Sequence, residues 1–255
     1  MRPVEKWILD EDLEKIYTAE YWNNIELEKK KAWWIAEGEY QNCRNYIKES
    51  GLLAEAEKAI ELSRIRDSTG KCEVVDLAAG IGWFSALISR IPNVSEIHAV
   101  EISDHRIGIL CEHAFKMLDG EAEKLHRYLG SFYETQLKTG SVDFIFLSQA
   151  FHHADNPLHL LVECDRLLKK GGKIVLIGEH FIDWKSVARR FFGEMARRRT
   201  ITFRFFDLFE PDPLLGDHYY MVQHYQFLFS CMGYDCTYEY IPETKTAIYM
   251  GTKKP

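Results

Sequence analysis

A glycine-containing turn and a carboxylate that follows it could together hold a nucleoside. Residues 74–82 read Val-Val-Asp-Leu-Ala-Ala-Gly-Ile-Gly, an apolar strand that runs into a turn and then opens a helix. Glycine lets the backbone come close to a ligand, and a helix N-terminus offers free N–H groups. Glu101 lies nineteen residues after Gly82, at the end of the next apolar segment, where a carboxylate can accept both hydroxyls of a ribose. The combination predicts a binding site for an adenosine nucleoside.

Histidines and a glutamate follow two later apolar segments. His152 and His153 come after residues 142–147, and Glu179 and His180 come after the next apolar strand. Ligands of open α/β sheets bind beyond the carboxyl ends of the strands, so we expect these side chains near the mouth of the site. Histidine is the usual base at neutral pH, which makes His152, His153 and Glu179 candidates for catalysis and His180 a candidate for substrate contact. For His153 the alternative is a loop held in place by hydrogen bonds.

The same histidines raise the question of a metal ion, which needs three or four converging ligands. His152, His153, His180, His218 and Asp155 could converge in principle. Their spacing along the chain gives no support for such a site. We therefore predict no metal ion.

The segment 181–217 is rich in basic and aromatic side chains. Residues 185–204 hold seven basic side chains against one acidic side chain. One interpretation is an inserted lid whose basic face meets an anionic small molecule, such as a phosphate or a carboxylate. A solvated helix with an apolar inner stripe is the alternative, and an RNA would also suit the basic patch. The candidates for substrate contact in this segment and just beyond it are Arg189, Arg190, His218 and Tyr219.

The hydrophobic pattern indicates which elements position these residues. We read residues 1–70 as helices that form a cover, and we expect residues 71–255 to form one α/β domain. After residue 71, short strands that are apolar on both faces alternate with helical patterns, which indicates a parallel sheet covered by helices on both sides. Residues 234–241 and 247–252 are joined by a turn too short for a helical crossover, so they predict an antiparallel hairpin.

Two separated stretches of the sequence resemble the class I S-adenosylmethionine-dependent methyltransferases. The string VVDLAAGIGWFS is similar to the first motif of that family, and VDFIFLSQAFHHADNPLHLLVECDRLLKKGGKIVLIGE is similar to its later strand–helix–strand segment. The resemblance covers roughly residues 72–180, and the final hairpin is similar to the reversed last strands of the family. It implies a Rossmann-like, mostly parallel seven-stranded sheet with an antiparallel C-terminal hairpin and a small-molecule methyltransferase activity.

The resemblance implies nine positions that bind S-adenosylmethionine. The turn matches the loop that holds the amino-acid end of the cofactor, Glu101 matches the ribose carboxylate, and the others match contacts to the adenine and the methionyl group. The nine positions are Asp76, Ala78, Gly80, Gly82, Glu101, Ser131, Phe132, Ser148 and Gln149. Ala78 stands where the family usually has a glycine, and Ser131 replaces a frequent aspartate.

The resemblance also implies methyl transfer to a small-molecule acceptor, with oxygen favoured over nitrogen or carbon. Two alternatives stay open: a non-catalytic methyltransferase-like partner subunit, and an RNA or protein methyltransferase. An NAD-linked dehydrogenase is disfavoured because the segment 80–85 ends in Ser85, where the G-x-G-x-x-G fingerprint has its third glycine.

The composition excludes several other classes of protein. The chain has 255 residues, of which 46% are hydrophobic, so it has the apolar surface that a disordered chain lacks. No apolar run approaches the roughly 20 residues that span a bilayer, and the first residues lack the apolar core of a secretory signal. We therefore expect a cytoplasmic protein without a membrane partner.

The net charge of −7 argues against general nucleic-acid binding. The six cysteines form no C-x-x-C pair, and we interpret them as reduced thiols. The oligomeric state stays open.

Overall fold

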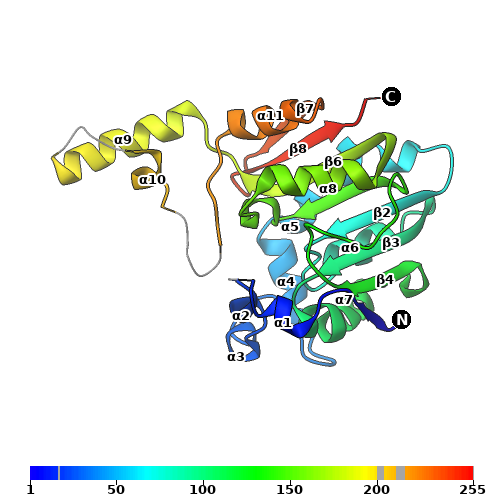
Figure 1. Ribbon diagram of the computed structural model, residues 1–255. Coiled ribbons are helices and arrows are strands. Elements are labelled where there is room, and N and C mark those ends of the chain that lie inside the picture. The colour runs from blue at the N-terminus through cyan, green and yellow to red at the C-terminus, as the bar shows by residue number, and fades with distance from the viewer. Residues whose placement is uncertain (17, 200–203, 211–215, 255) are drawn as a thin grey trace.

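The short apolar segments of the sequence pair into one sheet (Figure 1). The computed structural model describes residues 1–16, 18–199, 204–210 and 216–254. Within these residues the sheet has eight strands in the order β1-β4-β3-β2-β5-β6-β8-β7. The strands are β1 (Val4–Lys6), β2 (Cys72–Leu77), β3 (Val94–Glu101), β4 (Leu125–Leu129), β5 (Val142–Ser148), β6 (Leu168–His180), β7 (Asp235–Ile241) and β8 (Thr246–Thr252).

Most of the sheet is parallel, and only its C-terminal end is reversed. Strands β1, β4, β3, β2, β5 and β6 pair in parallel, whereas β8 runs antiparallel to both β6 and β7. The antiparallel hairpin predicted from the sequence is therefore confirmed. Parallel strands end at the same edge of a sheet, and in Figure 1 the arrowheads of β2 and β3 point to the left, towards that edge. The candidate site residues follow these strand ends.

The expected number of seven strands is wrong, because an eighth strand forms at the N-terminus. Val4 pairs with Arg127 of β4 and extends the sheet in parallel. Directly after this strand, Trp7 stacks on Tyr128 with 3.8 Å between the ring centroids. The expectation of helices throughout residues 1–70 is wrong at this strand. Three residues are too few to show a strand periodicity, so the pairing depends on contacts with β4 that the local sequence does not reveal.

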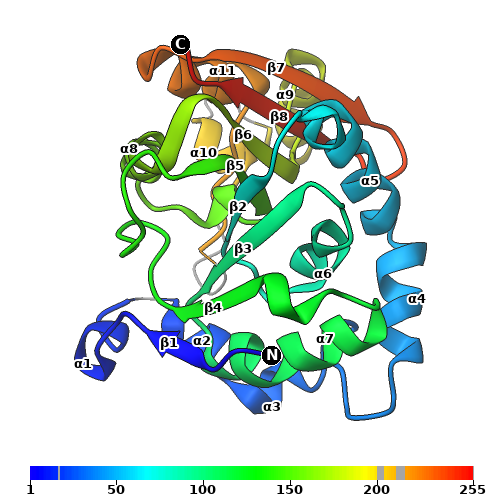
Figure 2. The ribbon, with the colours of Figure 1, turned by 90° about the vertical axis from the view of Figure 1, so that its right-hand side faces the viewer.

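Helices cover both faces of the sheet. They are α1 (Asp10–Leu13), α2 (Ala19–Trp22), α3 (Ile25–Glu28), α4 (Gln41–Glu49), α5 (Leu52–Ser63), α6 (Trp83–Ser89), α7 (Cys111–Met117), α8 (Pro157–Leu167), α9 (Trp184–Arg198), α10 (Phe205–Leu208) and α11 (Val222–Cys231). Helices α5, α6 and α7 pack on one face, and α8 and α11 pack on the other, which Figure 2 shows along the sheet.

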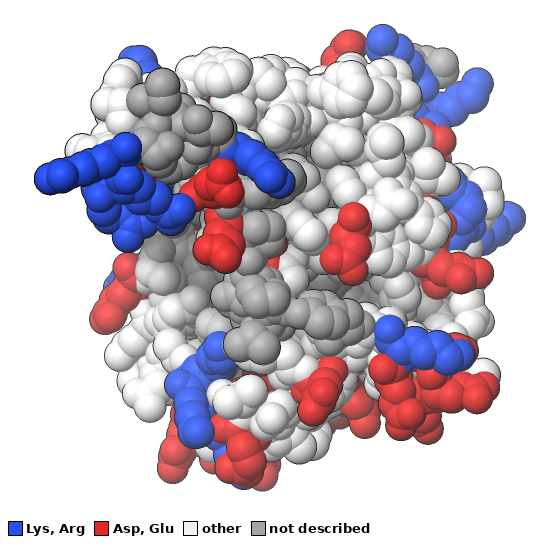
Figure 3. All heavy atoms as spheres, turned by 60° about the vertical axis from the view of Figure 1, so that its left-hand side comes forward, with Lys and Arg blue, Asp and Glu red and all other residues white. Residues whose placement is uncertain are grey.

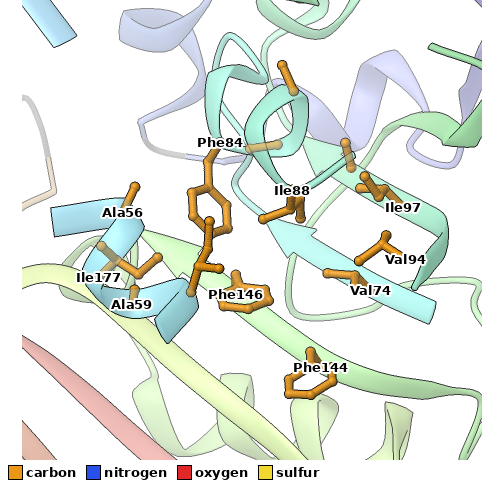
Figure 4. Packing of buried hydrophobic residues seen from close by; sticks show 14 of the residues in the cluster. Ala56, Ala59, Val74, Phe84, Ile88, Val94, Ile97, Phe144, Phe146 and Ile177 are labelled. Carbon is orange, nitrogen blue, oxygen red and sulfur yellow. The ribbon is translucent and has the colours of Figure 1, made fainter. Parts of the chain in front are cut away.

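The core on each face follows from the alternation of side chains along the strands. Val74 points to the face covered by α6, whereas its neighbour Val75 points to the face covered by α8. On the first face Phe84 of α6 points towards Phe146 of β5, with 5.0 Å between the ring centroids (Figure 4). Both rings are fully buried, and each such ring contributes a large share of the hydrophobic stabilisation. This packing fixes α6, and with it the turn that precedes α6.

The N-terminal cover and the insertion lie on either side of the carboxyl edge of the sheet. In Figure 1 helices α1 to α3 lie below this edge, and α9 and α10 lie above it and project from the body of the molecule. The cover has its own apolar cluster, in which Ile35, Cys43 and Ile47 meet Leu110 and Met117 of the α/β part. Residues 200–203 and 211–215 of the expected lid lie outside the described residues.

The six cysteines are free, and four of them are buried. Burial raises the pKa of the Cys43 and Cys111 thiols to about 12, which suits reduced and unreactive side chains. Among the described residues, no helix combines the length and the apolar character that a bilayer span requires.

Candidate functional site

The turn that follows β2 leaves an open approach to the backbone. Ala78, Gly80 and Gly82 have positive φ angles of 54°, 56° and 72°. A Cβ on Gly80 would meet nothing within 4 Å, whereas a Cβ on Gly82 would lie 2.6 Å from the sulfur of Cys111. Gly82 is therefore needed for the close packing of α6 on α7, and Gly80 leaves room for a ligand beside the turn.

The carboxylate at the end of β3 is tied to the same turn. Glu101 Oε2 accepts a hydrogen bond of 2.7 Å from the N–H of Gly80, and Oε1 accepts bonds of 2.9 Å from the N–H groups of Ile102 and Ser103. The side chain is 4% exposed. Because Oε2 accepts one of these bonds, it keeps a further lone pair for a ligand hydroxyl. The structure therefore joins the two features that the sequence placed nineteen residues apart.

Asp76 of β2 is buried and lacks a charged partner. The hydroxyl of Ser85 donates a 2.6 Å hydrogen bond to its Oδ2, while Oδ1 has no hydrogen-bond partner among the described residues. Burial raises the pKa of this carboxyl to about 7, with the bond from Ser85 acting against the rise and the charge of Glu101 adding to it. The unpaired oxygen is an acceptor that an N–H group of a ligand would satisfy.

The remaining candidate cofactor residues lie after β4 and at the end of β5. They are Ser131, Phe132, Ser148 and Gln149. Gln149 has a positive φ of 52°, and its N–H donates a 2.7 Å hydrogen bond to the carbonyl of Ile177 on β6. Its side chain packs so closely on Gly178 that a Cβ there would lie 2.7 Å from Gln149 Cγ. All nine candidate positions thus lie at or near the carboxyl ends of β2 to β5.

Glu179, near the end of β6, is a fully buried hub of hydrogen bonds. Its Oε1 accepts bonds of 3.2 and 3.0 Å from the N–H groups of Ala150 and Phe151, and its Oε2 accepts bonds of 3.0 and 2.9 Å from His152 Nδ1 and the Tyr225 hydroxyl. Burial alone would raise the pKa of Glu179 and lower that of His152. Their mutual attraction outweighs burial, so the pKa of Glu179 is lowered and that of His152 is raised.

Asp217 brings a second carboxylate to the two histidines. Its Oδ1 lies 2.9 Å from His153 Nδ1 and 4.0 Å from His152 Nε2. The two atoms of the 2.9 Å contact, His153 Nδ1 and Asp217 Oδ1, form an ion pair, and neither has a further hydrogen-bond partner among the described residues. Burial acts to raise the pKa of Asp217, but the neighbouring imidazoles lower it overall. The sequence analysis considered Asp155 instead, and the structure pairs Asp155 Oδ1 with His218 Nε2 at 3.1 Å.

His180 and Tyr219 border this group. Their rings stack with 4.6 Å between centroids, and the ring centroid of His180 lies 4.8 Å from that of His152. Burial lowers the pKa of His180 to about 4, so this imidazole is neutral at pH 7. The N–H of His218 donates a 2.8 Å hydrogen bond to the carbonyl of His152. The candidates at residues 152, 153, 179, 180, 218 and 219 therefore lie together.

The two arginine candidates of the insertion lie apart from this group. Arg190 donates a 2.7 Å hydrogen bond from Nη1 to the carbonyl of Leu208, and its guanidinium lies 4.4 Å from the ring centroid of Phe209. Arg189 is exposed on α9, as are Trp184 (67%) and Phe192 (60%). On the face shown in Figure 3, the largest group of Lys and Arg lies at the upper left, and smaller groups lie at the upper right and in the lower half. Arg190 therefore attaches α9 to α10.

The N-terminal cover adds residues that the sequence analysis did not assign to the site. Trp22 lies against the guanidinium of Arg106 at 4.6 Å and meets the ring of His153 at 5.2 Å. Asn23 Nδ2 donates a 3.3 Å hydrogen bond to the carbonyl of Ile102, and the Ser103 hydroxyl donates a 2.8 Å bond to the carbonyl of Trp22. The cover therefore connects the loop after Glu101 to the histidines, and no local pattern signals this contact.

Comparison with known protein families finds one match inside the chain. Residues 75–176 match a family described as "Methyltransferase domain". The match runs from β2 into β6, and so includes the glycine turn, Glu101 and both histidines of the turn after β5. A search of curated proteins by sequence finds no match to this chain.

Solved structures share the fold at low sequence identity. Magnesium protoporphyrin IX methyltransferase from Synechocystis PCC 6803, solved with bound S-adenosylhomocysteine, is 10% identical, with a TM-score of 0.62 over 94% of this chain and 100% of that one. A SAM-dependent methyltransferase from Thermotoga maritima is 17% identical, with a TM-score of 0.51 over 83% and 93% of the two chains. The cyclase SpnF is 12% identical, with a TM-score of 0.59 over 78% and 79%. At these identities the likeness concerns the fold alone.

Proposed function

The chain carries a class I S-adenosylmethionine-dependent methyltransferase domain on a Rossmann-like sheet, and from this premise we propose that it methylates an oxygen atom of a small-molecule acceptor. One observation carries the proposal: a group of buried and half-buried imidazoles and carboxylates lies at the same sheet edge as the glycine turn. We call this group, made of His152, His153, Glu179 and Asp217, the histidine cluster.

The turn after β2 and the end of β3 fit the cofactor. Gly80 leaves open space, Glu101 keeps a lone pair on Oε2, and Asp76 has a buried oxygen without a partner. We assign the turn to the amino-acid end of the cofactor, Glu101 to its ribose, the residues after β4 to its adenine and the end of β5 to its methionyl group. The bound cofactor supplies an electrophilic methyl group on a sulfonium, so the protein acts mainly by aligning the reactants.

The histidine cluster suits an acceptor that must lose a proton. During transfer the new O–C bond forms from a lone pair of the acceptor oxygen, the C–S bond breaks with its electrons left on sulfur, and the hydroxyl proton leaves towards the cluster. A neutral amine already carries a free lone pair and has less need of such a group. The cluster therefore supports oxygen over nitrogen as the methylated atom.

Within the cluster, His152 and Glu179 have different roles. His152 donates its Nδ1–H to Glu179, which leaves Nε2 as its free ring nitrogen. Glu179 is surrounded by four donors of the protein and is a positioning residue, since its oxygens are already occupied. This assignment differs from the sequence analysis, which treated Glu179 as a candidate for catalysis.

The surroundings of the cluster support a small acceptor with a negative charge. Trp22 flanks His153 and Tyr219 flanks His180, so aromatic rings border the cluster on two sides. We propose that the insertion serves as a lid, because Phe209 links Arg190 to Tyr219, with 6.1 Å between the ring centroids of Phe209 and Tyr219. The exposed arginines of α9 would attract an anionic acceptor towards this lid.

The test begins with calorimetric titration of the full chain with S-adenosylhomocysteine, with NAD as the control. We expect one-site binding of the first and none of the second. The chain is then incubated with methyl-labelled cofactor and a panel of small hydroxy acids, phenols, carboxylates and amines. Label on oxygen acceptors supports the proposal. Absence of S-adenosylhomocysteine binding would favour the non-catalytic partner subunit, and label only on amines, or only on RNA at low salt, would overturn the assignment of the acceptor.

A further inference from the structure

We propose that His152, His153 and Asp217 bind a divalent first-row transition-metal ion. One donor atom from each residue lies within 4.8 Å of the other two. The sequence analysis predicted no metal, because the spacing of its candidate ligands, which included Asp155, gave no support. Asp217 was not among those candidates, since it follows the histidines only after α8, β6 and the insertion. The binding of the ion stands independently of the proposed function, whereas its role in the reaction rests on that function.

The hydrogen bonding of His152 prepares one ring nitrogen as a ligand. Its Nδ1 donates to Glu179, which is itself fixed by the hydroxyl of Tyr225 and two backbone N–H groups. A metal-binding histidine commonly donates its second ring N–H to a carboxylate, which selects the tautomer and orients the ring. His152 therefore points its other ring nitrogen, Nε2, towards Asp217, and this is the nitrogen that would bind a metal ion.

The close approach of His153 and Asp217 supplies a second observation. His153 Nδ1 and Asp217 Oδ1 form an ion pair of 2.9 Å, and neither atom has a further hydrogen-bond partner among the described residues. Both side chains also lie next to His152, with 4.3 Å between the ring centroids of the two histidines and 4.0 Å between His152 Nε2 and Asp217 Oδ1. A cation placed between the three residues would therefore be bound by all of them.

The donor set and its spacing indicate which ions fit. Zinc binds imidazole nitrogen and carboxylate oxygen at about 2.0–2.2 Å in a tetrahedral arrangement, which places neighbouring donors about 3.3–3.6 Å apart. To reach this spacing, the distance of 2.9 Å between His153 Nδ1 and Asp217 Oδ1 needs to lengthen by about 0.4–0.7 Å, and the distance of 4.0 Å between His152 Nε2 and Asp217 Oδ1 needs to shorten by about the same amount. Two imidazoles and one carboxylate suit zinc, iron, manganese or cobalt rather than magnesium.

Three protein ligands leave coordination positions open, which is the arrangement of a catalytic rather than a structural ion. An acceptor hydroxyl that occupied an open position would be oriented and would lose its proton more easily, and an acceptor carboxylate would be oriented. In the metal-bound chain the ligating imidazole nitrogens would be occupied, so the hydroxyl proton would pass to solvent, whereas in the metal-free chain it would pass to the cluster. An anionic acceptor would also be attracted by the positive charge of the ion.

The first arm of the test measures metal binding without any acceptor. The full chain is dialysed against a chelator and then titrated with Zn²⁺ by calorimetry and with Co²⁺ by visible absorption. We expect one equivalent of each ion, and weakening by at least tenfold in Asp217→Asn and in His153→Gln. The control is Asp155→Asn, a nearby carboxylate outside the donor set, which we expect to bind Zn²⁺ as the unmodified chain does.

The second arm separates a failed metal site from a misfolded variant or a failed function. S-adenosylhomocysteine binding is measured on the same samples, and we expect Asp217→Asn to retain it because Asp217 lies outside the nine cofactor positions. If the unmodified chain binds the nucleoside but no equivalent of either ion, the cluster is a hydrogen-bonded group only and the metal proposal is overturned. Equal Zn²⁺ affinity in Asp217→Asn and the unmodified chain would also overturn it. Stoichiometric metal binding without nucleoside binding would leave the metal site standing and overturn the proposed function.

Discussion

Substitution of Glu101 by glutamine tests the nucleoside site with the smallest change in shape. The carboxylate accepts backbone N–H bonds on both oxygens, from Gly80 on Oε2 and from Ile102 and Ser103 on Oε1. A glutamine amide keeps one oxygen, so its NH₂ group must face a backbone N–H whichever way it turns. In the variant the glutamine NH₂ group therefore faces a backbone N–H, and both are hydrogen-bond donors. The variant also lacks the negative charge that a ribose hydroxyl would contact.

The expected loss of affinity follows from one charge-assisted hydrogen bond. Such a bond contributes about 1.5–3 kcal/mol, and about 1.4 kcal/mol corresponds to a tenfold change in Kd. Glu101→Gln should therefore weaken S-adenosylhomocysteine binding by roughly 10- to 150-fold. Glu101→Ala should weaken it further, because both oxygens are then lost and the loops on either side lose their common acceptor.

Calorimetric titration with S-adenosylhomocysteine measures this effect, and thermal unfolding of each variant shows that the fold is retained. The matched control is Glu96→Gln on the same strand, where the carboxylate is partly exposed and pairs with Arg2 and His126 away from the carboxyl edge. We expect the control to bind like the unmodified chain. A Kd for Glu101→Gln within threefold of the unmodified value would refute the assignment of the ribose carboxylate.

Three further substitutions test other parts of the site. Burial raises the pKa of Asp76 to about 7, so between pH 4 and pH 7 the folded chain keeps a proton that the unfolded chain loses. The stability that this group contributes is therefore complete below pH 4 and is lost as the pH rises through 7, so the difference in free energy of unfolding between the unmodified chain and Asp76→Asn should shrink by about 4 kcal/mol across that window. Denaturant titrations measure this difference, and a difference that does not change with pH would contradict the prediction. Ala78→Gly should relieve the strain of a positive φ of 54° and raise the free energy of unfolding by about 0.5–1 kcal/mol. The control Ala79→Gly, at a residue without a positive φ, should lower the free energy of unfolding, and an equal decrease in both variants would count against strain at Ala78. Trp22→Ala removes the contact with Arg106 and should weaken S-adenosylhomocysteine binding by about fivefold, from roughly 1 kcal/mol, while unchanged affinity would show that the cover does not contribute to the nucleoside site.

The arrangement of the glycine turn beside Glu101 could be predicted because its signals are local. A strand, a glycine turn, a helix and a second strand ending in Glu101 follow one another within thirty residues of chain, and parallel strands place their carboxyl ends side by side. The two glycines at residues 80 and 82 indicated a turn in the sequence, and both have the positive φ that glycine adopts without strain. Within this turn Ala78 departs from the rule, with a positive φ on a residue that has a side chain.

The arrangement of the histidine cluster could be predicted only in part. His152 and His153 were placed correctly at the sheet edge because they follow a strand, but their partner Asp217 comes from a segment that returns to the site after the insertion. The hub role of Glu179 depends on its complete burial beneath Tyr225, which is a tertiary contact. The basic composition of the insertion was visible, but not that Arg190 would bind the carbonyl of Leu208.

The contact of Trp22 with both halves of the site has a consequence for the order in which ligands bind. Its indole lies against the guanidinium of Arg106, five residues after Glu101 in the chain, and makes an edge-to-face contact with the ring of His153 in the histidine cluster. If one ligand orders the Trp22 side chain, the second ligand meets a side chain that is already ordered. The ligand that binds first therefore bears the entropic cost of ordering the cover. We therefore expect cofactor and acceptor to bind with positive cooperativity, and by thermodynamic linkage each should raise the affinity of the other by the same factor.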